Sequence, residues 1–369
     1  MVGDCVAWLC DALQMNRRDW IASAAACASA WRAQAASPSP QWPADFGAHP
    51  ASRIEWWYVT GSLDAGARLW GFQVTFFRSA TSLAPDHASR FAATELVFAH
   101  AALTDLEGKR LRHDQRIARS GFGVAEASTG DTRVALRDWQ LAREAAGPER
   151  SRYRAHVASD SAGFVFDLQF DASQLVLLQG IDGLSQKGPL PQQTSRYYSE
   201  PQLAVQGTLR LDGKALAVRG SAWLDHEWSD TLLDPQAVGW DWIGMNLLDG
   251  SALMVFRVRS ADGTSLYAGG SVRAPGQATR NFGPDEVRFT PGRVWASTSS
   301  KARYPVEWRV DTPAGSFNVK ALLDNQELDS RASTGAIYWE GLSDLLDAAG
   351  RRVGRGYLEM TGYAARLRL

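Results

Sequence analysis

Four short clusters in the chain combine tryptophan with ionisable residues. They lie at residues 55–58 (EWWY), 223–228 (WLDHEW), 240–242 (WDW) and 338–340 (YWE), and the whole chain holds 15 tryptophans. Tryptophan offers a large apolar surface and a π face that attracts cations. Acids and a histidine between such rings predict an aromatic-walled pocket that contains a few carboxyl groups. This pocket would suit a bulky apolar ligand, or a carbocation formed from one.

The third cluster places an acid, Asp241, between Trp240 and Trp242. Adding water to an isolated C=C bond needs a proton donor, and burial can keep a carboxyl group protonated for that role. We therefore expect Asp241 to be the catalytic acid. On a strand the two tryptophans share one face and Asp241 takes the other. All three can serve one pocket only if the site lies between two barrels or the backbone is irregular.

The second cluster follows the same alternation. Asp225 and Glu227 are predicted to share one strand face, and His226 shares the other with Trp228. We expect His226 and Trp228 to enter the ligand pocket, where His226 would position water or act as a base.

The full set of predicted substrate-binding residues is larger, and several members have a structural alternative. Glu55 could instead pair with Arg53 or with an arginine on a neighbouring strand, and Arg196 could cap a structural carboxylate. His226 could be a hydrogen-bonded core residue. The predicted set consists of Trp228, Trp240, Trp242, Glu55, Trp57, Tyr58, Tyr197, Tyr198, Arg196 and Trp339.

Other chemistries lack their motifs. The six histidines form no H-x-H or H-x-x-x-H pair, so no metal site is expected. The chain has no G-x-S-x-G, no phosphate loop and no dinucleotide fingerprint after a strand, so we expect no cofactor. Paired carboxylates for sugar hydrolysis stay open, although no spacing favours them.

The elements that carry these residues are predicted to be strands. Segments such as 69–77, 164–170 and 253–258 alternate and are rich in aromatic and β-branched residues. The spacing Trp57, Leu63, Asp64 recurs as Trp242, Leu248, Asp249 before a second strand. We therefore predict an all-β fold of two related barrels, at residues 45–234 and 235–369.

Composition and the N-terminus set the compartment. The net charge is −1 with no basic face, which argues against nucleic acid as a partner, and no apolar run approaches the ~20 residues that span a bilayer.

Arg17 and Arg18 precede an Ala-rich stretch and an A-x-A site at 33–35, which resembles a twin-arginine export signal over 1–35, with the start at Met15. Residues 36–44 form an extended lead-in. All three cysteines precede the cleavage site, so the mature protein is expected to be periplasmic or secreted.

Several longer stretches resemble the carotenoid 1,2-hydratase-like or AttH-like family of secreted, two-domain proteins. They are EWWYVTG (55–61), FQVTFFR (72–78), SRYYSEP (195–201), GSAWLDHEWSD (220–230), YWEG (338–341) and GRGYLEMTGY (354–363). The resemblance implies two lipocalin-like β-barrels packed together. It also implies catalytic roles for His226, Trp228 and Asp241. Gly239 stands where the hydratases have an aromatic residue, and the spacing from His226 to Asp241 also departs from their pattern.

These observations leave two functions open. The first is a cofactor-independent hydratase acting on a hydrophobic isoprenoid or lipid. The second is a non-catalytic periplasmic carrier that holds such a lipid in its cavity. Under either function, a lipid-transport partner in the envelope could deliver the ligand.

Overall fold

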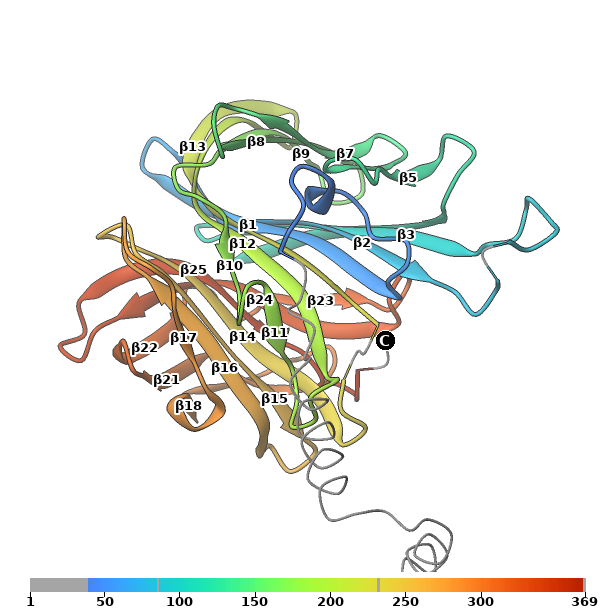
Figure 1. Ribbon diagram of the computed structural model, residues 1–369. Coiled ribbons are helices and arrows are strands. Elements are labelled where there is room, and N and C mark those ends of the chain that lie inside the picture. The colour runs from blue at the N-terminus through green and yellow to red at the C-terminus, as the bar shows by residue number, and fades with distance from the viewer. Residues whose placement is uncertain (1–38, 85, 231–232, 368–369) are drawn as a thin grey trace, which may run out of the picture. The chain divides into compact units, whose positions relative to one another are not determined.

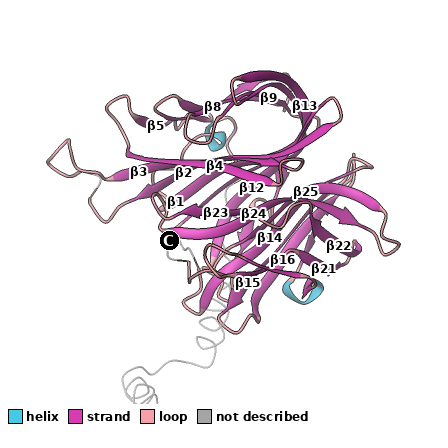
Figure 2. Ribbon diagram, turned by 180° about the vertical axis from the view of Figure 1, so that it is seen from behind, coloured by secondary structure: helices cyan, strands magenta, loops and turns pink. Residues whose placement is uncertain are grey.

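The computed structural model describes residues 39–84, 86–230 and 233–367. The predicted export signal and all three cysteines lie outside these residues. From Pro40 onward the chain forms one compact unit. Strands dominate it, and its described helices are two 3-10 turns, η2 (Ala44–Phe46) and η3 (Pro284–Glu286) (Figures 1 and 2). None of the helices in the described part is both long and apolar enough to cross a membrane.

The first sheet has thirteen antiparallel strands, in the order β4-β3-β2-β1-β13-β12-β9-β8-β7-β6-β5, with β10 and β11 added to β12. It curls so that β7–β9 cover β1–β3, which makes a nearly closed barrel (Figure 1). Its strands are β1 (Ile54–Ala65), β2 (Arg68–Ala80), β3 (Glu95–Asp105), β4 (Arg110–Arg119), β5 (Ala125–Ala127), β6 (Arg133–Leu136), β7 (Trp139–Ala145), β8 (Ser151–Ser159), β9 (Phe164–Asp171), β10 (Leu177–Leu178), β11 (Leu184–Gln186), β12 (Thr194–Leu211) and β13 (Lys214–Ser229).

The second sheet has ten strands, in the order β17-β16-β15-β14-β25-β24-β22-β21-β18, with β23 added to β24. A separate ribbon joins β19 and β20. The strands are β14 (Ala237–Leu247), β15 (Ala252–Ser260), β16 (Ser265–Arg273), β17 (Arg280–Phe282), β18 (Arg288–Pro291), β19 (Val294–Ala296), β20 (Arg303–Pro305), β21 (Glu307–Thr312), β22 (Gly315–Ala321), β23 (Glu327–Ser330), β24 (Ala336–Leu346) and β25 (Arg352–Met360).

The two sheets share one topology. The hairpin β1–β2 occupies the same place in the first sheet as β14–β15 in the second. In each sheet the opening strand also pairs with a late strand, β13 or β25. These are the two hairpins in which the sequence spacing recurs. The predicted all-β, lipocalin-like fold is confirmed, and the change of sheet falls between Ser229 and Ala237.

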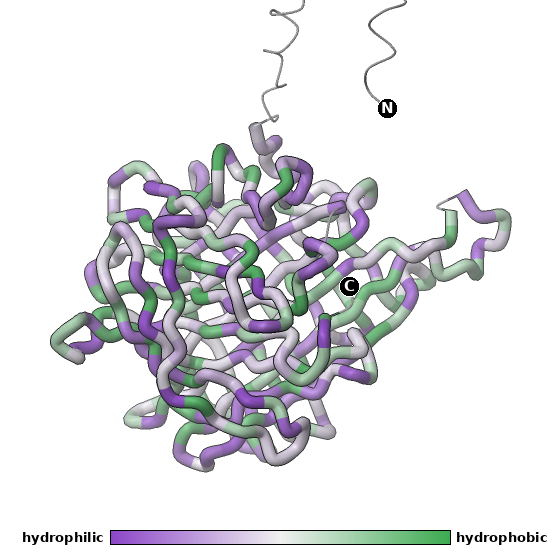
Figure 3. The backbone as a smooth tube through the Cα atoms, turned by 90° about the horizontal axis from the view of Figure 1, so that it is seen from below, coloured by the Kyte–Doolittle hydropathy of each residue, from purple (hydrophilic) through white to green (hydrophobic). Residues whose placement is uncertain are grey.

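Alternation along the strands builds the cores. In β9 the residues Phe164, Phe166, Leu168 and Phe170 are buried in the first barrel, while the residues between them are more exposed. Figure 3 shows hydrophobic and hydrophilic residues interleaved along the chain in this way. The second sheet packs around its own cluster, which includes Ile243 and Leu358.

A third apolar cluster lies between the two sheets. Tyr58 and Trp223 of the first sheet meet Trp242 and Phe256 of the second there. Asn246 of β14 also donates a hydrogen bond to the Ala222 carbonyl of β13, at 2.9 Å. The outer faces of the two sheets are therefore packed together, and the residues on those faces are the ones that can share a site.

Candidate active site between the two sheets

A cavity of about 290 Å³ lies between the two sheets. Both sheets contribute to its wall, which is mostly aromatic and aliphatic with a few acids. Lining residues from the first half of the chain are Ile54, Trp56, Tyr58, Thr75, Phe77, Ser79, Leu96, Phe98, Ile117, Lys187, Ser195, Tyr197, Asp225, Glu227 and Ser229; those from the second are Leu233, Trp240, Trp242, Phe256, Val258, Ser333, Thr334, Glu340 and Glu359. Its size and lining suit a small apolar ligand.

Strand register explains the first sheet's wall. Phe77, Trp56, Glu227 and Tyr197 lie opposite one another on β2, β1, β13 and β12, so they form one row. A parallel row two residues along contains Thr75, Tyr58 and Asp225. Because side chains two residues apart point to the same face, both rows face the cavity.

The second sheet supplies a matching row. Phe256, Trp242, Glu359 and Glu340 lie opposite one another on β15, β14, β25 and β24. Two carboxyl groups are thus direct cross-strand neighbours beside an indole ring. Like charges in that position repel strongly when they are buried, so the two acids cannot both be ionised at low cost.

The charges around the cavity do not balance. Four carboxyl groups line it, on Asp225, Glu227, Glu340 and Glu359, and Lys187 is the one cation among the lining residues that the structure describes. Burial and the charge of Glu359 raise the pKa of Glu340 well above its usual range. Burial raises the pKa of Glu359 to about 8. The pair therefore holds at least one proton at neutral pH.

Asp225 is buried among donors. The Ser199 hydroxyl and the Trp223 indole N–H donate to its Oδ1 at 2.5 and 2.7 Å, and the Tyr197 hydroxyl donates to its Oδ2 at 2.8 Å. Burial raises the pKa of Asp225 to about 7 in spite of these bonds. Asp225 consequently changes its protonation state near neutral pH.

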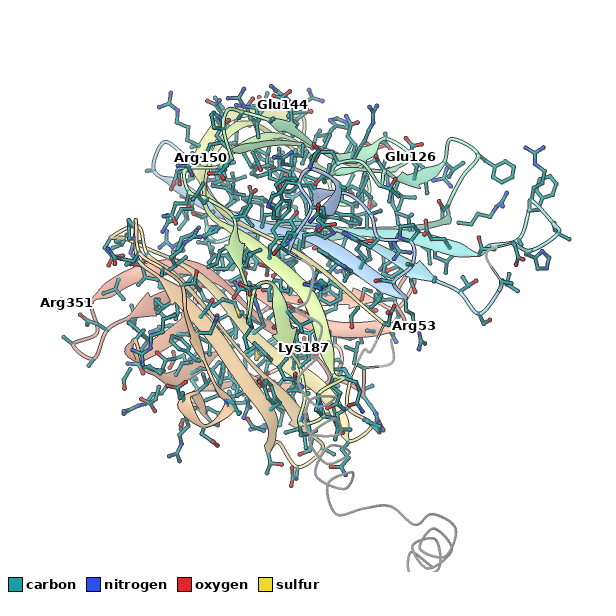
Figure 4. All side chains as sticks on the ribbon, in the orientation of Figure 1. Arg53, Glu126, Glu144, Arg150, Lys187 and Arg351 are labelled. Atoms are coloured by element: carbon teal, nitrogen blue, oxygen red, sulfur yellow. The ribbon has the colours of Figure 1, made fainter. Side chains whose placement is uncertain are left out.

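Lys187 holds the remaining acid in place. Its Nζ lies 2.9 Å from Glu227 Oε1, and it also lies over the rings of Tyr197 and Phe256, at 4.4 and 4.6 Å from their centroids. Figure 4 shows Lys187 where the loop after β11 runs beside the second sheet. The ammonium group therefore fixes the position of the Glu227 carboxyl group on the cavity wall.

Asp241 lies outside this cavity. Its carboxylate is fully buried on the opposite face of β14, 2.7 Å from Arg257 Nε and 3.0 Å from Arg259 Nε, and the Tyr363 hydroxyl donates to it at 2.9 Å. The predicted alternation is correct, because the Trp240 and Trp242 rings face the cavity instead. Two arginines and a tyrosine hydroxyl contact this carboxyl group, which therefore belongs to a buried polar network away from the cavity.

His226 also lies away from the cavity, inside the first barrel. It stacks on Trp57 with ring centroids 4.6 Å apart, its Nε2 lies 2.8 Å from Glu55 Oε1, and its Nδ1 lies 3.1 Å from the Tyr198 hydroxyl. Burial lowers the pKa of His226, which favours a neutral ring. The ring of Trp228 stacks on His49 instead of lining the cavity.

Glu55 is the centre of this second network. Burial would raise its pKa, but hydrogen bonds from His226 and His49 outweigh that effect and lower it. Arg78 on the neighbouring strand donates to Glu55 at 2.8 Å, so the arginine alternative considered for Glu55 is the arrangement found. Ligand atoms of His49, Glu55 and His226 lie within 4.8 Å of one another. Arg78 also donates to the carbonyls of His49 and Ser52, so the cluster ties the segment just ahead of β1 to the first barrel.

The remaining predicted residues divide between wall and core. Tyr58 and Tyr197 line the cavity with Trp240 and Trp242. Trp339 is buried in the second barrel, where its indole N–H donates to the Asp324 carbonyl at 2.7 Å. Arg196 is half-buried on β12, in register with Trp228.

Sequence reasoning missed the acids that the structure brings together. Asp225 and Glu227 were placed on the correct shared face but were not predicted to bind the ligand, and Glu340 was not among the predicted site residues. Glu359 received no role. Its signal is an acid two residues after Tyr357 in an otherwise apolar strand segment, a pattern that places it on the same face as that ring.

A chain of two lipocalin-like barrels, with a ligand-sized cavity between them, defines the class of this protein. The AttH-like family matches residues 33–363. The chain belongs to this family. No curated protein matches the chain.

Solved structures share the fold. A Nitrosomonas europaea protein assigned to AttH is 46% identical, with a TM-score of 0.81 over 89% of this chain and 98% of that one. Kievitone hydratase from Nectria haematococca is 16% identical, with a TM-score of 0.67 over 90% and 95%. CghA with Sch210972 is 13% identical, with a TM-score of 0.52 over 86% and 90%. The last two similarities concern the fold alone.

Proposed function

We propose that this protein adds water to a C=C bond of a hydrophobic isoprenoid or lipid, without a cofactor, in the cavity between its sheets. The observation that carries the proposal is the Glu340–Glu359 pair, which retains a proton beside the Trp242 indole in an apolar cavity. A protonated carboxyl group is the donor that this chemistry needs. The kievitone hydratase named above has the same fold, which is consistent with this reaction type.

The donor is Glu359 or its partner Glu340, in place of Asp241, because Asp241 lies outside the cavity in ion pairs with two arginines. The indole of Trp240 donates to Glu359 Oε1 at 3.0 Å and fixes the orientation of that carboxyl group. The face of Trp242, next to it, stabilises positive charge that develops on the ligand, by roughly 2 kcal/mol when water is excluded.

A second group must place the water. Glu227 forms an ion pair with Lys187, and Asp225 borders the same cavity on the next row. Either carboxylate can accept the proton that water loses as its oxygen bonds to carbon. In this scheme the proton donor lies on the second sheet and the proton acceptor lies on the first.

The test uses the protein with the lipid extract of its own cells in heavy-oxygen water, followed by mass spectrometry of the lipids. Label in one lipid, lost in Glu359→Gln and kept in the exposed-site control Glu126→Gln, supports the proposal. Label that persists in Glu359→Gln would discard this acid. If no lipid takes up the label but a lipid is recovered bound to the protein, the result would favour the carrier function over the enzyme.

We further propose that the mature protein acts in the periplasm or outside the cell, on the basis of the paired arginines at 17 and 18 and the A-x-A site at 33–35. Fractionation of the cells with N-terminal sequencing tests this. A cytoplasmic protein that keeps residues 15–35 would contradict it.

A further inference from the structure

Two buried oxygen atoms on the cavity wall have no hydrogen-bond partner among residues 39–84, 86–230 and 233–367. They are the Tyr58 hydroxyl on β1 and Oε2 of Glu340 on β24. Both residues are only 5% exposed. A buried polar atom without a partner costs about 1–3 kcal/mol, so such atoms in a cavity indicate a ligand that completes them.

Other polar groups of the cavity wall do have hydrogen-bond partners. Asp225 accepts hydrogen bonds on both of its oxygens, and Glu359 accepts one from Trp240. The cavity therefore does not lack partners in general. The deficit is confined to one residue from each sheet, on walls that face each other.

Both groups act as donors at neutral pH. Burial, and then the charge of Glu340, raises the pKa of Tyr58 well above its usual value, so the phenol keeps its proton. Glu340 keeps its proton for the reason given above. Both residues line the same cavity, Tyr58 from the first sheet and Glu340 from the second. Two neutral O–H donors suit one acceptor oxygen on the ligand, and a phenol paired with a protonated carboxyl can stabilise an enolate oxygen.

We propose that the ligand carries a carbonyl oxygen that accepts hydrogen bonds from Tyr58 and Glu340, and that the double bond to be hydrated is conjugated with this carbonyl. The substrate class is then an α,β-unsaturated ketone or ester on an apolar skeleton. The reaction claim rests on the function proposed above, whereas the binding claim does not.

The bonds balance without a further reactant. The water oxygen bonds to the β-carbon, and its proton passes to Asp225 or Glu227. The π electrons of the C=C bond move toward the carbonyl, whose oxygen gains charge under the hydrogen bonds of Tyr58 and Glu340. Glu359 then gives its proton to the α-carbon as the carbonyl re-forms. The net change is one hydrogen and one hydroxyl added, and solvent returns the carboxyl groups to their starting states.

The test compares two probes of the same shape, 2-acetylnaphthalene and 2-isopropenylnaphthalene, which differ in a carbonyl oxygen against a methylene group. Binding is followed by tryptophan fluorescence. Tyr58→Phe and Glu340→Met should each lower the affinity for the ketone by about tenfold. The affinity for the hydrocarbon should change by no more than about twofold. Tyr267→Phe removes a hydroxyl outside the cavity wall and should change neither. The carbonyl stretch of the bound ketone should move to lower frequency in the wild type and revert in Tyr58→Phe.

Equal effects of Tyr58→Phe on both probes, or no ketone binding by the wild type, would overturn the inference. If selectivity is lost in the variants but no lipid takes up heavy oxygen, the proposed hydration fails and the carbonyl site stands. If a labelled product has no carbonyl, the hydration stands and the substrate class proposed here fails.

Discussion

Glu340 and Glu359 lie directly opposite each other on the neighbouring strands β24 and β25, and both carboxyl groups border the cavity between the sheets. Two acids in this position share protons instead of ionising together. The two residues belong to different sequence motifs. The antiparallel pairing of β24 with β25 brings them opposite each other. Everything proposed for the chemistry depends on that proton.

Replacing one member of the pair should separate chemistry from binding. Glu359→Gln keeps the shape and removes the proton donor, so turnover should fall about 10²- to 10⁴-fold while ligand affinity changes little. Stability should not fall, because the glutamine amide oxygen can accept the hydrogen bond that the Trp240 indole donates to Glu359. Turnover with each lipid in the extract and calorimetric melting measure the two effects. Equal loss of affinity and turnover would make Glu359 a binding residue only.

Activity should depend on pH through the same group. Because the donor is the protonated form and the pKa of Glu359 is about 8, the rate should fall as pH rises through about 8. The folded state also binds this proton more tightly than the unfolded state, so stability is lost as pH rises from about 4.5 through about 8. A rate profile that is flat across this interval would contradict the assignment.

Asp241→Asn should act on stability. The substitution leaves Arg257 and Arg259 without their buried carboxylate, a change that costs about 3–5 kcal/mol. Chemical denaturation measures this loss, with Asp249→Asn in the exposed β14–β15 turn as the control. A variant of unchanged stability that has lost all turnover would instead give Asp241 the catalytic role expected from its position between two tryptophans.

Glu200 provides a pH test away from the cavity. It is buried in the first barrel, where the Ser151 hydroxyl donates to it at 2.6 Å, and burial raises its pKa to about 7. The folded-state pKa lies above the usual 4.5, so Glu200 makes folding less favourable as pH rises from about 4.5 to about 7. Each pKa unit corresponds to about 1.4 kcal/mol. Glu200→Gln should therefore melt at a higher temperature than the wild type at about pH 8. The difference between the two melting temperatures should be smaller at about pH 5. A constant difference at both pH values would contradict this.

Which residues share a strand face could be predicted from the sequence. Whether that face lines a barrel interior or packs against the other sheet could not. Alternation correctly separated Trp240 and Trp242 from Asp241, and Asp225 from His226. Whether a face points into a barrel or toward the other sheet depends on how the two sheets pack. That packing is a long-range property, so the sequence favoured His226 and Asp241 over the acids that line the cavity.

Glu359 illustrates a second limit. Its importance comes from its neighbours Glu340 and Trp242, which are brought beside it by the pairing of β25 with β24 and β14. No local spacing reveals this register. Lys187, from the loop between β11 and β12, reaches the cavity in the same long-range way.

The central claim is that the carboxyl pair of the cavity holds a proton at neutral pH. Infrared difference spectroscopy between the wild type and the Glu340→Gln, Glu359→Gln double variant measures it directly. The account predicts a carbonyl band of a protonated acid at about pH 7 that weakens as pH rises through about 8 and is absent from the double variant. A spectrum at about pH 7 that shows only carboxylate bands from this pair would contradict the account.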